Sequence, residues 1–391
     1  MKLLYATCYL DVSGVTKINF DILSGMAADC EIHICTTQRQ DRSSSNWESR
    51  FSATFREPFQ LWQLPRRDRY AGLLGYLREH RIELIYLTHS LWLYEHAARL
   101  KRDLPGLRII DSLHVLEPYC FRGGYPDISA NRFVHPHIDK SILISHHLRD
   151  YLIRNYPVQP EKLVVVHNGI DAEKFLPRGG GAAIRAELGL APQDRLVGFI
   201  GRFTLQKRPL LFLEIARELC RRDPTVSVYM VGDGPLEAGI RQGVERYGLT
   251  GRLRTLGTRD DIPALLNATD LLLLPSAYEG APLTILEALS VGVSVVASAV
   301  GAVAEYVTGQ CRLVPLGSGG SAERDAFVAE ALDLLASAKG AGFLAPEHRL
   351  DQVIRRYRGV FEAAFSRNEG HGLALNEHLA SPSPVIPAEE M

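Results

Sequence analysis

The stretch P-S-A-Y-E-G-A-P-L-T-I-L-E-A-L-S-V-G-V-S-V-V-A-S-A, at residues 275–299, decides the fold class of this chain. The run D-L-L-L-L at 270–274 precedes it and is typical of a buried parallel strand. A helix-period pattern begins at Leu283, Gly292 ends it, and residues 293–297 form a second buried run. Strand, loop, helix and strand in this order predict a doubly wound α/β sheet.

Two glutamates hold set places in this unit. Glu279 lies in the loop at the carboxyl end of the first strand, and Glu287 lies eight positions later, about one turn into the helix. Ligands of open α/β sheets bind outside the carboxyl ends of the strands, and the free N–H groups at a helix start suit a phosphate. Carboxylates beside such a phosphate can accept hydrogen bonds from sugar and ribose hydroxyls. Either glutamate alone is better explained as a solvated surface residue, but the pair in this frame favours a ligand site.

The composition sets wide bounds on the protein. The chain has 391 residues, of which 46% are hydrophobic and 23% charged, with a net charge of -1. This length predicts two or three domains, and the charge gives no reason to propose nucleic acid as a partner. The six cysteines show no C-x-x-C spacing and are typical of reduced residues. Without a signal peptide or a membrane-spanning run, we expect a cytoplasmic protein, with peripheral attachment at the inner face of the membrane left open.

Strand-like and helix-like segments alternate through both halves of the chain, which predicts two parallel sheets flanked by helices. Residues 1–175 are predicted to form one Rossmann-like domain and residues 176–350 a second, with the ligand site between them. The glycine run at 179–181 is predicted to be a flexible connector. A last helix is predicted within 351–367, followed by a disordered tail at 368–391 that is rich in Pro, Ser and Glu.

The individual elements follow from apolar runs and helix-period patterns. Besides those above, strands are predicted at 2–7, 31–37, 83–88, 107–111, 140–144, 163–166, 196–201, 226–231 and 253–256. Helices are predicted at 15–26, 70–80, 209–221, 236–247, 322–338 and 350–366, and a polar loop at 41–46.

Two cations follow the first strand of the second half. Arg202 comes directly after Gly201, and Lys207 comes five residues later, before the helix that begins at Pro209. Cations at the carboxyl end of a strand can neutralise a diphosphate, although two solvated loop cations explain the pattern equally well. The next motif, G-D-G-P at 232–235, predicts a tight turn, and its glycine spacing does not match a dinucleotide fingerprint.

In this order, the motifs resemble those of the retaining glycosyltransferases of family 4, whose GT-B fold has two Rossmann-like domains facing a central cleft. The resemblance covers roughly residues 1–365 and is strongest over 197–307. There the chain reads V-G-F-I-G-R-F-x3-K-R-P, V-G-D-G-P, L-L-L-P-S-x2-E-G-x-P-L-x3-E-A-L-S-x-G-V-x-V-V-A-S and G-x3-E-Y-V. The first half matches more loosely, with V-V-H-N-G-I-D-x3-F at 165–175 and I-S-H-H-L at 144–148. The resemblance also implies that the last helix crosses back to the first half.

The resemblance implies roles for the residues that match. Arg202 and Lys207 would hold the donor diphosphate. Glu287 would bind the ribose hydroxyls, and Glu279 would contact hydroxyls of the donor sugar. Recognition of the base is expected from loop residues beginning at Gly257.

Two turns depart in part from the family pattern. Backbone N–H groups near Leu283 and Thr284 would also face the diphosphate, but Pro282 replaces a frequent glycine and offers no N–H. In the first half, Gly14 would let the backbone approach the phosphate and acceptor side, although Ser13 stands where the family often has a second glycine.

A histidine of the first half is also expected in the site. His114 follows a predicted strand, where the family often places a histidine near the far hydroxyls of the sugar. His89, His146 and His147 also follow strands, so position alone favours His114 only slightly among the 13 histidines. Residues that could shape an acceptor pocket follow it: Glu117, Tyr119, Arg122 and Tyr125.

No metal or cofactor is expected. The second half has no D-x-D between strand and helix, and Asp260 with Asp261 is interpreted as a helix cap before Pro263. The resemblance implies that protein cations take the place of a metal at the diphosphate, and that the nucleotide-diphosphate sugar is the substrate.

The predicted function is retaining transfer of a sugar from a UDP- or GDP-linked donor to a sugar or lipid-linked acceptor, in cell-envelope polysaccharide, lipopolysaccharide or glycoconjugate synthesis. Retaining glycosidases use two carboxylates about 5 Å apart. Since Glu287 is assigned to the ribose, we expect same-face attack, with the leaving phosphate accepting the proton. Two alternatives stay open: a sugar-nucleotide epimerase of the same fold, and a catalytically silent subunit that binds sugar nucleotides. A phosphorylase is disfavoured because no context for a pyridoxal lysine is present.

Overall fold

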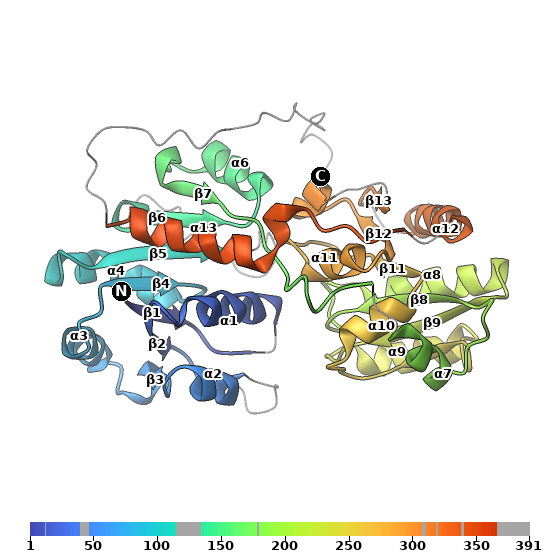
Figure 1. The fold of residues 1–391 in the computed structure, drawn as a ribbon, viewed down its shortest axis with the longest axis horizontal. Coiled ribbons are helices and arrows are strands. Elements are labelled where there is room, and N and C mark those ends of the chain that lie inside the picture. The colour runs from blue at the N-terminus through green and yellow to red at the C-terminus, as the bar shows by residue number, and fades with distance from the viewer. Residues whose placement is uncertain are drawn as a thin grey trace.

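The computed structural model describes residues 1–11, 13–39, 47–114, 134–177, 180–306, 310–317, 320–337 and 340–365. Two parallel sheets covered by helices make up this part of the chain (Figure 1), which confirms the predicted α/β class. The first sheet has the strand order β3-β2-β1-β4-β5-β6-β7, and the second has the order β10-β9-β8-β11-β12-β13.

The first half contributes the following elements. Its strands are β1 Lys2–Thr7, β2 Glu31–Thr36, β3 Phe59–Gln60, β4 Leu84–Leu87, β5 Arg108–Leu113, β6 Lys140–Leu143 and β7 Leu163–Val165. Its helices are α1 Gly14–Met26, α2 Glu48–Thr54, α3 Arg69–Glu79, α4 Leu91–Asp103 and α6 His146–Asn155, with short 3-10 turns η1 Leu61–Gln63, η2 His135–His137 and η3 Pro160–Lys162.

The second half repeats the architecture. Its strands are β8 Arg195–Ile200, β9 Val226–Val231, β10 Leu253–Thr255, β11 Leu271–Leu274, β12 Ser294–Ser298 and β13 Cys311–Val314. Its helices are α7 Gly181–Glu187, α8 Pro209–Arg222, α9 Glu237–Arg246, α10 Ile262–Ala268, α11 Leu283–Ser290 and α12 Ser321–Ala336, followed by α13 Leu350–Ala363, with 3-10 turns η4 Gly301–Tyr306 and η5 Pro346–His348.

The strand orders explain where a ligand site can form. Buried strands such as β11, in which all four residues are buried leucines, suit parallel sheets that are covered on both faces. In each sheet the order reverses beside the first strand of the domain, between β1 and β4 and between β8 and β11. Such switch points leave a crevice at the carboxyl ends of the strands.

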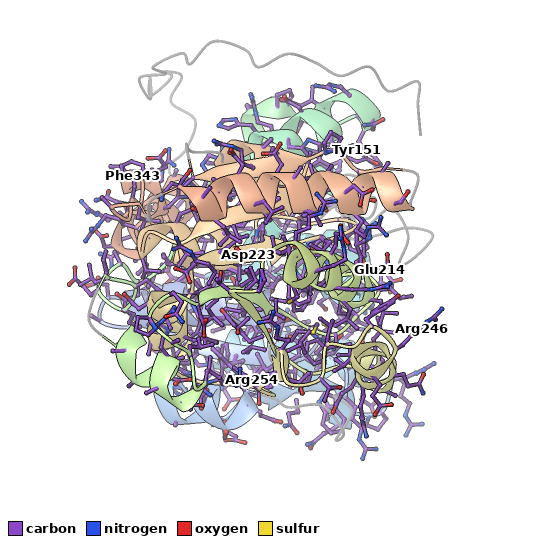
Figure 2. The ribbon with its side chains drawn as sticks, turned by 90° about the vertical axis from the view of Figure 1, so that its right-hand side faces the viewer. Tyr151, Glu214, Asp223, Arg246, Arg254 and Phe343 are labelled. Carbon is purple, nitrogen blue, oxygen red and sulfur yellow. The ribbon has the colours of Figure 1, made fainter. Side chains whose placement is uncertain are left out.

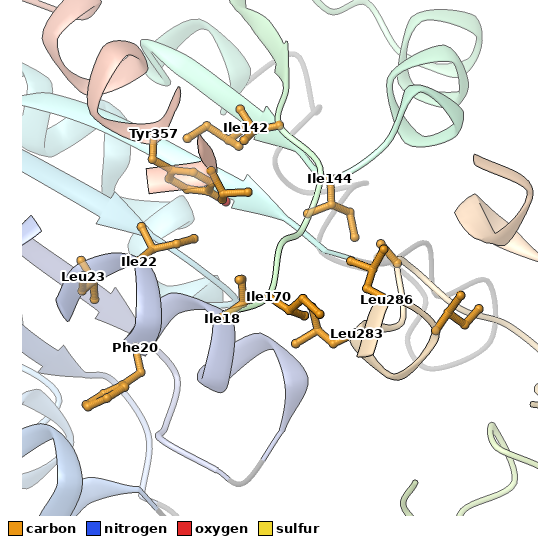
Figure 3. Packing of buried hydrophobic residues seen from close by; sticks show 14 of the residues in the cluster. Ile18, Phe20, Ile22, Leu23, Ile142, Ile144, Ile170, Leu283, Leu286 and Tyr357 are labelled. Carbon is orange, nitrogen blue, oxygen red and sulfur yellow. The ribbon is translucent and has the colours of Figure 1, made fainter. Parts of the chain in front are cut away.

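One hydrophobic cluster continues from the first domain into the second. Figure 3 shows Ile18 of α1 and Ile170 of the connecting segment beside Leu283 at the start of α11. Tyr357 of α13 belongs to the same cluster. Because these side chains share one apolar cluster, the starts of α1 and α11 are held close together.

The last helix, α13, packs on the first domain although it follows the second domain in sequence (Figure 1). The rings of Tyr357 and Phe361 lie 5.9 and 5.3 Å from the ring of Tyr86 in β4, measured between centroids. A short parallel bridge between Ile170 and Arg349 leads into the helix. The end of the chain therefore helps to complete the core of the first domain.

One predicted connector is in part a helix. Gly181 was assigned to the flexible run at 179–181, but it is the buried first residue of α7. Residue 179, the loop at 41–46 and the tail at 368–391 lie outside the described residues.

The position of α13 generates a prediction about stability. All three tryptophans, Trp47, Trp62 and Trp92, belong to the first domain, so their fluorescence reports its unfolding. Phe361 is fully buried, and Phe361→Ala should lower the free energy of unfolding reported by the tryptophans by about 3–5 kcal/mol.

The control is Phe343→Ala, because residue Phe343 is 61% exposed at the surface seen in Figure 2. It should change the same free energy by about 0.5 kcal/mol or less. Urea denaturation checks both variants. If Phe361→Ala left the fluorescence transition in place, α13 would not belong to the core of the first domain.

Candidate functional site

A cavity of about 700 Å³ lies between the two domains. Its first-domain wall comes from the segments that follow β1, β4 and β5 and from the start of α1. Its second-domain wall comes from the segments that follow β8 and β11 and from the start of α11. Both switch points therefore border the same cavity, at the carboxyl ends of both sheets, where a ligand is expected.

Most residues predicted for the site line this cavity. They are Gly14, His114, Arg202, Lys207, Glu279, Leu283, Thr284 and Glu287. Gly257 is not among the lining residues; its carbonyl oxygen accepts a hydrogen bond from the Gly232 N–H at 2.9 Å. The fold thus brings together residues that are more than 260 positions apart, from Gly14 to Glu279.

Glu279 is buried and already paired with a cation. Its Oε1 lies 2.5 Å from Lys207 Nζ and accepts a hydrogen bond from Ser276 Oγ at 2.6 Å. Backbone contacts tie the two loops together, since the Ala277 N–H donates to the Gln206 carbonyl oxygen at 2.7 Å. A buried carboxylate needs such compensation because burial removes its hydration.

Glu287 is also buried, with 9% of its side chain exposed, and its partner comes from the other domain. Lys17 Nζ, on α1, lies 3.7 Å from Glu287 Oε1. Burial raises the pKa of Glu287, and the charge of Lys17 and the hydrogen bond from it act in the opposite direction. No motif of the sequence marks Lys17, because only the tertiary fold places α1 beside α11.

The three cations of the R-F-x3-K-R motif have different surroundings. Arg202 is exposed at the cavity and forms no ion pair within the part of the chain that the structure describes. Arg208 points elsewhere and binds the buried carboxylate of Glu323 in α12 through two hydrogen bonds of 2.7 and 2.8 Å. Arg202 and Lys207 are therefore the cations available to a ligand, and Arg208 holds the loop to α12.

The start of α1 leaves open space at the cavity. Ser13 caps the helix by accepting a hydrogen bond from the Thr16 N–H at 3.2 Å. Asp11 Oδ1 accepts from the hydroxyls of Ser13 and Thr16 at 2.9 and 2.8 Å, which fixes the turn. A Cβ atom added to Gly14 would meet no protein atom within 4 Å, so a ligand can approach this backbone closely.

At Gly280 the two domains touch. A Cβ atom at this position would lie 1.8 Å from the carbonyl oxygen of His114, so only glycine permits the observed approach. Asn168 adds a hydrogen bond from its side-chain amide to the Ala281 carbonyl oxygen at 3.0 Å. These contacts place the loop that carries Glu279 directly against the first domain.

Comparisons with known proteins agree with this architecture. The family model of the glycosyl transferases group 1 matches residues 182–310, and that of Glycosyltransferase Family 4 matches residues 12–174. The D-inositol 3-phosphate glycosyltransferase of Rhodococcus jostii is 30% identical over 334 residues, which cover 77% of this chain and 72% of that protein. The chain belongs to glycosyltransferase family 4.

Further relatives of this family 4 glycosyltransferase differ in coverage. An Escherichia coli UDP-Gal:alpha-D-GlcNAc-diphosphoundecaprenol alpha-1,3-galactosyltransferase is 36% identical over 154 residues, which cover 38% of this chain and 40% of that enzyme. The crystal structure of HepE from Anabaena in complex with UDP has a TM-score of 0.76 at 20% identity, covering 93% of this chain and 100% of that chain. This likeness confirms the predicted GT-B fold.

Two histidines of the enzyme face the cavity as neutral groups. Burial lowers the pKa of His114 to about 3, with His89 adding to the effect. Its Nε2 lies 2.8 Å from Ser112 Oγ, while its buried Nδ1 has no hydrogen-bond partner among the residues that are described. Burial also lowers the pKa of His89 to about 4 against the charge of Asp11, and its ring lies 6.0 Å from that of His114. Neutral imidazoles suit hydroxyl groups as ligands.

His146 and His147 belong instead to the domain junction. Their backbone N–H groups, at the start of α6, donate to the carboxylate of Glu305 in η4 at 3.1 and 2.7 Å. His167 Nε2 lies 2.9 Å from the same carboxylate. Burial raises the pKa of Glu305, but these three hydrogen bonds outweigh it and leave the pKa below its usual value. Glu305 comes from the G-x3-E-Y-V motif, whose role at the domain junction is not evident from the sequence alone.

Other predictions met different outcomes. Asp261 holds the N-cap position of α10 but makes no capping hydrogen bond, because its carboxylate accepts hydrogen bonds from Arg259 at 2.7 Å instead. The helix-cap interpretation is thus wrong for its side chain. Glu117, Tyr119, Arg122 and Tyr125 lie outside the described residues. Within the described ranges, no three His, Cys, Asp or Glu residues group so as to hold a metal, and no helix is both long and apolar enough to span a bilayer.

The Glu305 junction predicts a pH-dependent contribution to stability. Glu305→Gln removes the charge from three hydrogen bonds and should lower the thermal midpoint at pH 7. The expected loss in the free energy of unfolding is about 1.5–3 kcal/mol. Because the pKa of Glu305 is lowered on folding, this contribution is complete above the unfolded-state pKa and is lost as the pH falls through the folded-state pKa.

Calorimetric scans between pH 7 and pH 3 check this prediction. The difference between wild type and Glu305→Gln should shrink toward the acidic end. Glu245→Gln, at an exposed position of α9, is the control and should match wild type throughout. A difference that is independent of pH would contradict a role for the carboxylate charge.

Proposed function

We propose that this glycosyltransferase moves a sugar from a nucleotide-diphosphate sugar to an acceptor hydroxyl with retention of the anomeric configuration. The observation that carries the proposal is the convergence of Arg202, Lys207, Glu279 and Glu287 on one cavity between two α/β domains. HepE has been crystallised with UDP and with UDP-glucose, and the Escherichia coli relative is named for a UDP-linked donor. These names support a UDP-linked donor, with a GDP-linked donor as the other candidate.

The charges of the cavity suit departure of a diphosphate. Cleavage of the bond to the diphosphate leaves negative charge on the phosphate and positive charge on the sugar. Arg202 is free to bind the diphosphate, and Lys207 can turn to it from Glu279. Glu279 would then face the sugar hydroxyls as positive charge develops. The leaving phosphate accepts the proton of the attacking hydroxyl on the same face, so no separate base is required.

The acceptor should approach from the first domain, where the neutral rings of His114 and His89 line the cavity. We propose a sugar or lipid-linked acceptor of cell-envelope or glycoconjugate synthesis, used on the cytoplasmic side of the membrane. The relatives named for inositol phosphate and undecaprenol-linked acceptors support this class of polar, hydroxyl-bearing acceptor. Protein cations are proposed to neutralise the diphosphate without a metal.

Arg202 and Lys207 together form the proposed diphosphate clamp, which gives a direct prediction. Arg202→Ala and Lys207→Ala should each weaken binding of the nucleoside diphosphate by roughly 10- to 150-fold, because each removes a charge-assisted contact of about 1.5–3 kcal/mol. Isothermal titration with UDP, GDP and ADP identifies the ligand and measures the loss.

The control variant is Arg246→Ala, at an exposed position of α9 on the face seen in Figure 2, which should bind like wild type. Excess EDTA should leave the affinity of wild type unchanged. Equal affinities for Arg202→Ala, Lys207→Ala and wild type would refute the proposal that these two cations bind the diphosphate. Loss of binding in EDTA that Mg²⁺ restores would refute the metal-free proposal.

The two glutamates should differ in kinetics. Glu287→Ala should mainly weaken nucleotide binding, because ribose contacts exist equally in the ground and transition states. Glu279→Gln should keep nucleotide affinity but lose turnover, because its charge faces the reacting sugar. Measurements of affinity and of donor consumption with and without acceptor separate the roles. The reverse pattern would exchange the assignments, and conversion of donor alone to an epimer would identify another reaction.

A further inference from the structure

Lys17 is a cation of the first domain that reaches the donor side of the cavity. It lies in the first turn of α1, beside the open space at Gly14, and lines the cavity. Its Nζ lies 3.4 Å from Asp21 Oδ2 and 3.7 Å from Glu287 Oε1 across the domain boundary. The lysine side chain is 35% exposed and forms part of the cavity wall.

Stability of α1 does not explain a lysine at this position. The start of a helix carries partial positive charge, and a cation in the first turn is unfavourable by a few tenths of a kcal/mol. The first turn of α1 contains no acidic residue that would offset this effect. The Lys17–Asp21 pair is partly exposed, and such pairs contribute little. The helix itself therefore gives no reason for a lysine where α1 meets the cavity.

The geometry leaves one N–H donor of the Lys17 ammonium group available to a ligand. An ammonium group has three N–H donors, and Lys17 has two carboxylate neighbours, Asp21 and Glu287. Glu287 is the proposed ribose ligand, and it lies one turn after Leu283 and Thr284, whose N–H groups are proposed to face the diphosphate. Ile18 and Leu283 belong to one apolar cluster (Figure 3), which keeps Lys17, the neighbour of Ile18, near α11. The third donor can thus serve the phosphate next to the ribose.

We propose that Lys17 binds the diphosphate of the donor, as a third cation supplied by the first domain. This inference rests on the proposed function, since it assigns a further residue to the same donor site. Arg202 and Lys207 bind from the second domain, and Lys17 binds from the opposite wall of the cavity. The donor is then held by both domains, so that its binding favours the arrangement in which the acceptor wall faces the sugar.

The experiment compares wild type, Lys17→Met and Lys17→Arg by isothermal titration with whichever of UDP, GDP and ADP binds wild type most tightly. Lys17→Met should weaken binding roughly 10-fold, corresponding to one exposed charge-assisted contact. Lys17→Arg should stay within a few-fold of wild type because it keeps the charge. Lys174→Met, at an exposed lysine paired with Asp171, is the control and should bind like wild type. Thermal midpoints without ligand establish that each variant is folded.

A second ligand separates phosphate binding from mere support of Glu287. The 2′,3′-dideoxynucleoside diphosphate with the same base lacks the hydroxyls that Glu287 would bind. If Lys17 binds phosphate, Lys17→Met weakens this ligand by the same factor. If the effect vanishes with the dideoxy ligand, Lys17 acts only through Glu287 and the inference is wrong. Equal affinity of Lys17→Met and wild type for the ordinary ligand also overturns it, while the proposed function stands. If wild type binds none of the three nucleotides, the proposed function itself fails.

Discussion

Two buried glutamates at the meeting point of two domains need positive charge beside them, and the arrangement of the cleft follows from this need. Glu279 is paired with Lys207 of its own domain, and Glu287 faces Lys17 of the other. Removing one member of a buried pair typically costs about 3–5 kcal/mol, because the remaining charge has lost its hydration. A structural purpose would be served as well by apolar residues of similar volume, so charges retained beside a large cavity indicate ligand binding.

The fold supplies the precision that this arrangement requires. Parallel sheets present the carboxyl ends of all their strands at one edge, and here the edges of both sheets border one cavity. Gly280 allows the loop of Glu279 to touch the backbone of His114, and the apolar cluster that includes Ile18 and Leu283 joins α1 to α11. Glu305 adds a polar link between the domains at the start of α6. The site therefore depends on the junction between the two domains as well as on the charged residues that line the cavity.

The local sequence predicts the site residues of the second domain well and those of the first domain less well. Strand, loop, helix and motif are contiguous from Arg202 to Glu287, so their order alone places the cations and carboxylates at one edge of the sheet. Long-range contacts cannot be predicted in this way. Lys17 is a site residue only because α11 places Glu287 beside it, and Arg208 differs from Lys207 only because it pairs with Glu323 in α12. Position after a strand could not separate His114 from His146 and His147, because all follow strands, and burial at the cavity distinguishes them. The loop that begins at Gly257 follows β10 at the outer edge of its sheet, and Gly257 does not line the cavity.

The central claim is that Lys17 and Lys207 compensate the buried carboxylates of Glu287 and Glu279 in the free protein. When the donor binds, Lys207 leaves Glu279 and binds the diphosphate. A crystal structure of the protein with the tightest-binding nucleoside diphosphate tests this most directly. The account predicts the diphosphate within about 3 Å of Arg202 and Lys207, with Lys207 turned away from Glu279 and the ribose on Glu287. A diphosphate bound elsewhere, or one bound at the cavity while Lys207 remains on Glu279 without touching phosphate, would contradict it.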